Sequence, residues 1–171
     1  LNNKTPYLII EDFNTTGLIG LIDKKLADPE LAEKYAKHNT LLSFLSETGG
    51  NAKPNGRTSG GTWGLGKNAI IKRSVIDTFI VYSIRADENE IHTNPESELC
   101  NPKQIIGGRT NIPNFSVREN GGYKEYNGEA NLGINSEGYT KPINDKKEIN
   151  EWVENITHLN RNGDSGTSIF I

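Results

Sequence analysis

The feature that most restricts how this chain can fold is a glycine-rich segment, GGTWGLGKNAI, at residues 60–70. From Gly61 it reads G-x-x-x-x-G-K, the pattern of a phosphate-binding P-loop, but Asn68 stands where that motif has the Ser or Thr that holds magnesium. A P-loop also follows directly on a buried strand, whereas the stretch before Gly61 is NAKPNGRTSG, a polar loop sequence. These two departures exclude the P-loop interpretation.

The glycine segment still has the properties of an anion site. Its glycines let the backbone turn tightly and expose N–H groups, and the helical stretch that starts near Lys67 directs its positive end into that turn. The lysine adds a full positive charge. The alternative is a surface loop closed by the start of a helix, and the segment taken alone leaves both interpretations open.

Apolar patterning elsewhere predicts an α/β domain. Residues 6–12, PYLIIED, are typical of a short buried strand that brings Glu11 and Asp12 to its carboxyl end. A helix is predicted from Asp28 to Gly49, and a second one at 145–159. The β-branched and aromatic residues at 77–85 predict a strand. Further strands or hairpins are expected at 104–112, within 115–143 and at the end of 163–171.

Composition restricts the class of protein. A chain of 171 residues with 33% hydrophobic residues and 18 glycines suits one domain with long polar loops. The formal net charge is -3, and the Lys and Arg residues are scattered along the chain, so no signal for binding nucleic acid or a membrane surface is visible. The apolar runs are too short to cross a bilayer. The single Cys100 is typical of a reducing compartment, so we expect a cytoplasmic protein. His92 and Cys100 lack a second ligand pair, so no metal site is predicted.

The order of these features resembles the GHKL ATPases, the family of gyrase B, Hsp90, histidine kinases and MutL. IIEDFNTTGL is similar to the first box of that family, GGTWGLGKNA to the second and SGTSIFI to the third. The resemblance implies a Bergerat fold: a two-layer α/β (α+β) sandwich with a mixed, mainly antiparallel sheet and helices on one face. It also implies ATP or ADP as the ligand. Its implied binding residues are Asp12 for the adenine amino group, with Asn14, Thr16 and Gly17 beside it, Gly61, Gly64, Leu65, Gly66 and Lys67 for the phosphates, and Gly166 and Thr167 closing the adenine side.

Two departures from the family pattern affect the expected activity. The first box usually reads D-x-G-x-G, whereas here Asn14 and Thr16 take those places and Gly17 follows one position later. The family also places a helix with a magnesium-binding Asn and a water-activating Glu before this box, and too few residues precede the strand here to form it. Because the chain also opens on Leu1 and contains no Met, we expect a single ATP-binding domain over 1–171 that lacks this helix.

The expected function is therefore an ATP-binding module that couples nucleotide occupancy to a conformational change, with residues 18–59 as the ATP lid. The intact protein would be an ATPase that uses magnesium, and the chain as given would bind nucleotide weakly without turnover. No catalytic residue is assigned. The alternatives are a histidine-kinase-like catalytic domain and a GHKL scaffold that has lost its nucleotide. Relatives dimerise through the lid, which makes a homodimer the expected protein partner.

Overall fold

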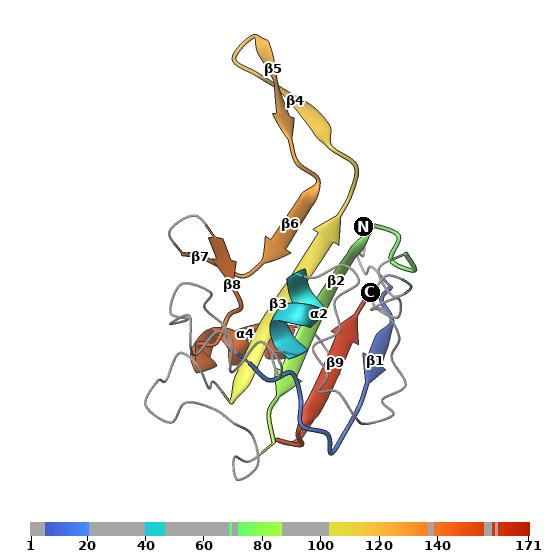
Figure 1. Cartoon of the computed structure of the whole chain (residues 1–171), viewed down its shortest axis with the longest axis vertical. Coiled ribbons are helices and arrows are strands. Elements are labelled where there is room, and N and C mark those ends of the chain that lie inside the picture. Colours follow the sequence, from blue (N-terminus) through green and yellow to red (C-terminus); the bar gives the residue numbers. More distant parts are fainter. Residues whose placement is uncertain are drawn as a thin grey trace.

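The centre of the molecule is strand β2, Thr78–Ile84, whose sequence TFIVYSI is mostly apolar on both faces. In the computed structural model, β2 lies in a five-stranded sheet of order β1-β9-β2-β3-β6 (Figure 1). Each neighbouring pair in this sheet is antiparallel. The other strands are β1 (Ile9–Glu11), β3 (Gln104–Asn111), β6 (Glu129–Leu132) and β9 (Gly166–Phe170). The structure describes residues 6–20, 40–46, 69, 72–86, 103–136, 139–155, 159 and 161–171.

One face of the sheet is covered by helix α2, Thr40–Ser46. Leu41 and Leu45 of this helix pack against Phe79 and Val81 of β2, and the ring of Phe44 meets Phe79 edge-on with 5.5 Å between ring centroids. Leu41 and Val81 are completely buried, so the α2 face carries one of the two apolar clusters among the described residues.

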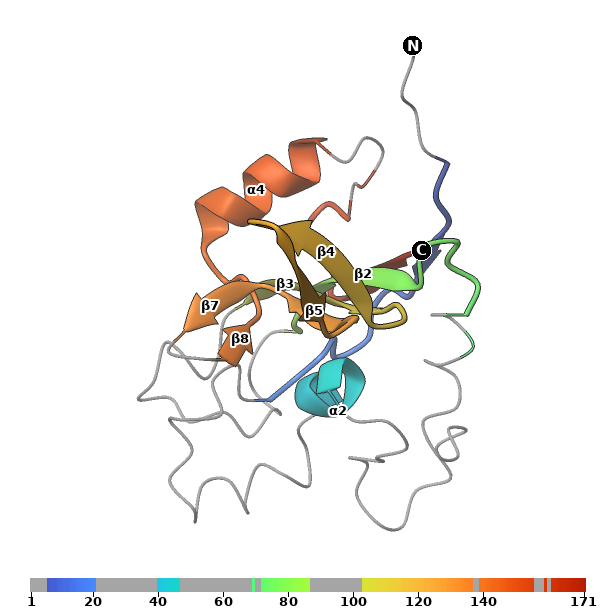
Figure 2. The ribbon, with the colours of Figure 1, turned by 90° about the horizontal axis from the view of Figure 1, so that it is seen from above.

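The opposite face is covered by helix α4, Lys146–Asn155. Asp145 caps its start, since its Oδ1 accepts a hydrogen bond of 2.9 Å from the N–H of Glu148. Ile149 is completely buried beneath the helix, and Trp152 packs edge-on against Phe170 of β9. Figure 2 shows α4 and α2 on opposite sides of the sheet. The expected arrangement with helices on one face is therefore wrong for these two helices, because the alternating residues of β2 are apolar on both faces and each face needs a cover.

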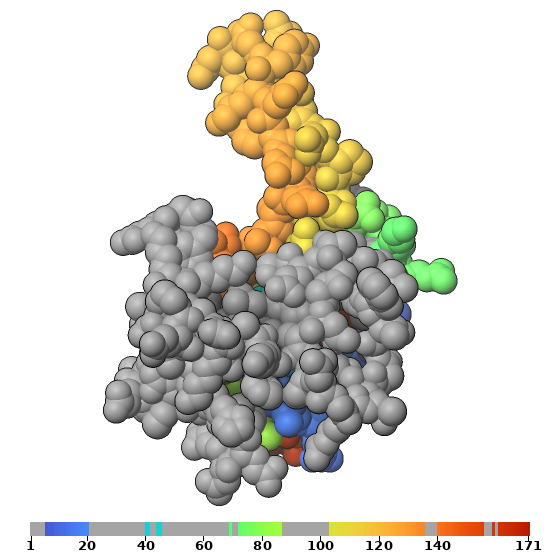
Figure 3. Space-filling model, viewed as in Figure 1, coloured from blue at the N-terminus to red at the C-terminus, as the bar shows by residue number. Residues whose placement is uncertain are grey.

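A long hairpin extends beyond the sheet. Strands β4 (Phe115–Glu119) and β5 (Gly122–Tyr126) follow β3 and return to β6, and they project from the rest of the molecule (Figures 1 and 3). Asn120 and Gly121 join the two strands with positive φ angles of 48° and 84°, the geometry of a type I′ turn. A smaller hairpin joins β7 (Ile134–Ser136) to β8 (Tyr139–Lys141).

Most of the predicted elements that fall on described residues are present. β2 confirms the strand expected at 77–85, α4 the helix at 145–159 as far as Asn155, and β9 the strand at the end of the chain. β1 is present, but the expectation that it is buried is wrong: Leu8 and Ile10 are about half exposed. Among the described strands, β1 lies at the edge of the sheet and pairs with β9 alone. Of the helix expected from Asp28 to Gly49, the described part is α2.

Candidate functional site

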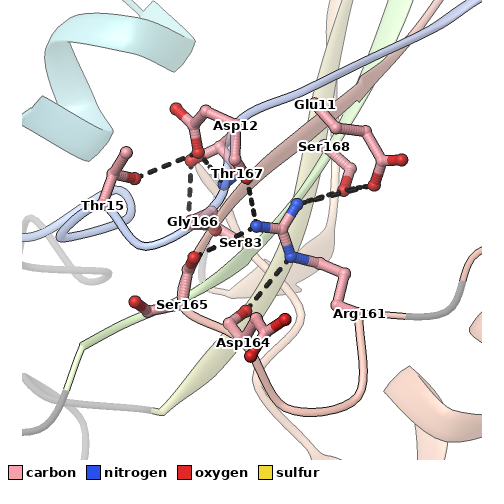
Figure 4. A network of polar contacts seen from close by, with 10 residues as sticks. All are labelled: Glu11, Asp12, Thr15, Ser83, Arg161, Asp164, Ser165, Gly166, Thr167 and Ser168. Atoms are coloured by element: carbon pink, nitrogen blue, oxygen red, sulfur yellow. Dashed lines mark hydrogen bonds and ion pairs between the residues drawn. The ribbon is translucent and has the colours of Figure 1, made fainter.

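The carboxyl end of β1 meets the start of β9, and this junction brings Asp12 and Thr167 together from opposite ends of the sequence. The N–H of Thr167 donates a 2.5 Å hydrogen bond to Oδ1 of Asp12, and the hydroxyl of Thr15 donates a second bond of 3.0 Å to the same oxygen (Figure 4). The backbone N–H of Asp12 in turn donates to the carbonyl of Thr167 at 3.0 Å. One oxygen of an exposed carboxylate is thereby fixed in place.

The turn after Asp12 depends on two residues with left-handed backbone conformations, Asn14 and Gly17, whose φ angles are 57° and 69°. The N–H of Asn14 donates to the carbonyl of Ser165 at 2.8 Å, which ties this turn to the one before β9. A Cβ atom at Gly17 would lie 2.5 Å from the carbonyl oxygen of Ile84, so the close approach of the turn to β2 requires glycine. Thr16 is exposed, and its carbonyl accepts from the N–H of Ala86.

Ser83 of β2 connects this turn to β9. Its side chain points to the α2 face and is completely buried. The Ser83 hydroxyl oxygen accepts from the N–H of Leu18 at 2.8 Å and donates to the carbonyl of Gly166 at 3.1 Å. It also shares a hydrogen bond of 3.2 Å with the hydroxyl of Thr167. Ser83 was not among the residues predicted from the sequence, although its place after Phe79 and Val81 in a period-two pattern marks it as facing inward.

Arg85 follows directly after the last residue of β2 and is also almost completely buried. Its guanidinium donates from Nε to the carbonyl of Leu18 at 2.8 Å and from Nη2 to the carbonyl of Gly20 at 2.9 Å. This residue was not predicted either. These bonds fix residues 18–20, the first part of the range expected to form a lid.

A second polar cluster, centred on Arg161, lies on the α4 face of the sheet, opposite the cluster of Asp12, Thr167 and Ser83. The guanidinium is buried and forms an ion pair with Glu11, with 3.5 Å between Nη1 and Oε1. Ser168 lies between them, accepting from Nη1 at 2.8 Å and donating to the Glu11 carboxylate at 2.7 Å. Burial raises the pKa of the nearby Tyr82 phenol, and the positive charge of Arg161 opposes that rise.

Arg161 reaches the first cluster through the backbone. Its Nη2 donates to the carbonyl oxygens of Asp12 and Ser165, the latter at 3.2 Å, and its guanidinium carbon lies 4.4 Å from the ring centroid of Phe13. A Cβ atom at Gly166 would overlap with the Asp12 carbonyl and with this guanidinium. Nothing in the polar sequence around Arg161 distinguishes it from a solvated arginine, so its role could not be predicted from the sequence.

The structure thus brings the predicted Asp12 and Asn14 of the first box against Thr167 and Ser165 of the third. The predicted Thr16 and Gly17 lie instead against the residues at and just after the end of β2, Ala86 and Ile84. The predicted phosphate-binding residues Gly61, Gly64, Leu65, Gly66 and Lys67 lie outside the described residues, as do His92, Cys100 and most of the expected lid. In the described part of the chain, no group of three or more His, Cys, Asp or Glu side chains is placed to hold a metal ion. Among the same residues, no helix has the length and apolar character needed to span a membrane.

A cavity of about 690 Å³ lies at the opposite end of β1 and β9, near Tyr7 and Ile171. Its walls are mainly apolar, and Val75, Ile76 and Phe170 are among the lining residues. None of the predicted site residues that the structure describes lines it, so the cavity and the Asp12 cluster are separate features.

Comparison with known proteins adds no relative. No protein-family model matches the chain, and no match was found among curated proteins or solved structures. Function must therefore be inferred from the geometry of the Asp12 junction and from the residue patterns of the three boxes.

Proposed function

We propose that this chain is an ATP-binding domain of the Bergerat type, which binds the adenine base on the α2 face where β1 meets β9. The observation that carries the proposal is the state of the Asp12 carboxylate. Thr167 and Thr15 both donate to Oδ1, and in the described part of the chain Oδ2 receives no hydrogen bond. An oriented acceptor is therefore free to receive a donor from a ligand.

The chemistry of this acceptor favours adenine. An ionised carboxylate only accepts hydrogen bonds, and the exocyclic amino group of adenine is a donor at a base edge. Thr167 carries a hydroxyl group beside its N–H contact to the carboxylate, and a hydroxyl can donate to a ring nitrogen or accept through a water. The buried Ser83 hydroxyl supports the Thr167 hydroxyl from within the protein, at 3.2 Å. The combination matches the first and third boxes of the resemblance, which assign the adenine contact to Asp12 and the closing contact to Thr167.

The same residues provide a route from nucleotide occupancy to the lid. Ser83 contacts Thr167 at the proposed base site and also holds the N–H of Leu18. Residues 18–59 are the proposed lid, and the glycine segment from Gly61 to Lys67 is proposed to receive the phosphates. A ligand that shifts Thr167 would act on the first residue of the lid through one serine side chain.

ATP hydrolysis is part of the proposal only through the family resemblance. The family carries its magnesium ligand and its water-activating carboxylate on a helix before the first box. In the described part of the chain, no three or more His, Cys, Asp or Glu side chains lie together as metal ligands, and no described residue is assigned to magnesium. We therefore derive no catalytic step for this chain.

The test is thermal and chemical unfolding of the chain with ADP and with a non-hydrolysable ATP analogue. A ligand present at about a hundred times its dissociation constant stabilises the folded state by about 2.7 kcal/mol. We expect this stabilisation in the wild type and its loss in Asp12→Asn. The asparagine can keep the bond from Thr167 through its oxygen but presents an amide donor to the adenine amino group.

Asp164→Asn is the matched control. Asp164 is exposed and lies in the turn before β9. Its substitution removes one negative charge, as Asp12→Asn does, but it leaves the Asp12 side chain and the Asp164 backbone carbonyl in place. The proposal predicts that this variant is stabilised by nucleotide as strongly as the wild type. A wild type that is unaffected by both nucleotides at millimolar concentration would contradict the proposed function and would favour a scaffold without nucleotide.

A further inference from the structure

The ladder between β1 and β9 changes its hydrogen-bond pattern at Asp12. Near the start of β1, Leu8 and Ile171 exchange both of their backbone hydrogen bonds, at 2.8 and 3.0 Å, and the register continues through Ile10 opposite Ile169. Asp12 and Thr167 occupy the next hydrogen-bonded position, where a regular ladder would again have two backbone bonds. Only the bond from the Asp12 N–H to the Thr167 carbonyl is of this kind.

The second backbone bond of this pair, from the Thr167 N–H to the Asp12 carbonyl, is replaced by two other hydrogen bonds. The N–H of Thr167 donates to the side-chain Oδ1 of Asp12, and the Asp12 carbonyl accepts from Nη2 of Arg161 instead. A guanidinium is a stronger donor than a neutral amide, so it can hold the carbonyl against competition from the ladder. With the guanidinium bound to this carbonyl, the Thr167 N–H donates to the side-chain carboxylate instead.

The surroundings of Arg161 fix it in the position that this exchange needs. Its side chain is 1% exposed, Nε donates to the carbonyl of Asp164 at 3.3 Å, and Nη1 is held by Ser168 and Glu11. A buried guanidinium with a carboxylate partner and several carbonyl acceptors has its charge and its donors satisfied. These contacts hold the guanidinium in place against the Asp12 carbonyl on the α4 face of the sheet.

We propose that Arg161 is a positioning residue for the base contact: by holding the Asp12 carbonyl from the α4 face, it lets Thr167 orient the Asp12 carboxylate on the α2 face. The inference rests on the proposed function, because the oriented carboxylate is the group proposed to read the adenine amino group. Arg161 itself does not touch the ligand, and Glu11 serves as its counter-ion.

The experiment measures nucleobase selectivity by calorimetry with ADP and with inosine diphosphate, which has a carbonyl oxygen in place of the adenine amino group. We expect the wild type to favour ADP by about tenfold or more, the value of one charge-assisted hydrogen bond. In Arg161→Lys, which keeps the charge but loses the forked donor, the ADP affinity should fall towards that of inosine diphosphate. The affinity for inosine diphosphate should stay nearly unchanged. A merely structural role would lower both affinities together and leave their ratio as in the wild type.

A second variant removes the buried pair as a whole. The double variant Glu11→Gln with Arg161→Met removes both charges of the pair, so neither charge is left buried without its partner. We therefore expect this variant to fold even if Arg161→Lys does not. It should show the same loss of selectivity. Arg109→Lys is the control, because Arg109 lies in β3 and pairs with Glu129 at 3.3 Å, away from the junction. Its selectivity should equal that of the wild type.

A measurement on the wild type alone completes the test. NMR couplings across hydrogen bonds should join the Thr167 amide to the side-chain carboxyl carbon of Asp12, and a coupling to the Asp12 backbone carbonyl instead would overturn the inference. Retained selectivity in both Arg161 variants, with selectivity lost in Asp12→Asn, would also overturn it while leaving the proposed function standing. A wild type that binds neither nucleotide would contradict the proposed function itself.

Discussion

At the scale of single residues, two features of Gly17 disfavour any other residue at this position: its backbone conformation and its close approach to β2. Its φ of 69° disfavours any side chain, and a Cβ would lie 2.5 Å from the Ile84 carbonyl oxygen. We expect Gly17→Ala to lower the free energy of unfolding by at least about 2 kcal/mol, since the turn must move away from β2. Urea denaturation gives the value.

Gly121 provides the comparison for this prediction. It lies in the turn between β4 and β5 and also has a positive φ, 84°, but no atom lies within 4 Å of the position that a Cβ would take. Gly121→Ala therefore has only the conformational cost, about 1 kcal/mol. Equal losses in the two variants would show that the approach of Gly17 to β2 has no energetic weight.

The residues of the candidate site differ in how far the sequence could indicate them. Asp12 and Thr167 were predicted because each lies in a short pattern of its own, and the structure brings the two together. Ser83 carries a weaker signal, a polar residue on the inward face of an apolar strand. Arg161 carries none, since its burial arises from the turn before β9 folding back on β1, which is a long-range event.

At the scale of elements, the packing of α2 bears on the proposed lid at residues 18–59. The helix falls within 18–59, yet Leu41 is completely buried against β2 and Ile105. We expect Leu41→Ala to lower the free energy of unfolding by about 2–5 kcal/mol, as for other large-to-small changes in a packed core. Leu132→Ala in β6 is the control, because that side chain is 42% exposed and should cost less than about 1 kcal/mol. A small loss for Leu41→Ala, measured by urea denaturation, would place α2 with a mobile lid rather than with the core.

The elements also show what patterning can and cannot predict. The strand predicted at 77–85 is present as β2 because its β-branched and aromatic residues favour a strand. The helix predicted at 145–159 is present as α4 over Lys146–Asn155 because its apolar residues recur at helical spacing. The burial of β1 was predicted wrongly, because an apolar run does not reveal how many neighbours a strand has. The placement of α2 and α4 on opposite faces depends in the same way on tertiary packing that no single segment encodes.

At the scale of the whole molecule, the candidate site and the projecting hairpin β4–β5 are separated by the length of the sheet (Figure 1). The contacts of the hairpin are local: Phe115 stacks on Tyr126 with 5.5 Å between centroids, and the Tyr126 hydroxyl donates to Glu119 at 2.6 Å. At its base, the N–H of Ile112 donates to the carbonyl of Gly128 at 3.2 Å. The two ends of the hairpin are therefore close enough for a tight turn to replace it.

Replacing residues 113–127 with Asn-Gly should join β3 to β6 through a two-residue turn. The sheet keeps its pairing and both faces of its core, so we expect the free energy of unfolding to change by about 1 kcal/mol or less. Nucleotide affinity should also be unchanged, because Asp12 and Thr167 keep all of their contacts. Calorimetry and urea denaturation of the shortened chain measure both quantities. A large loss of ADP affinity with unchanged stability would mean that the hairpin takes part in binding, and the site would then extend far beyond the junction of β1 and β9.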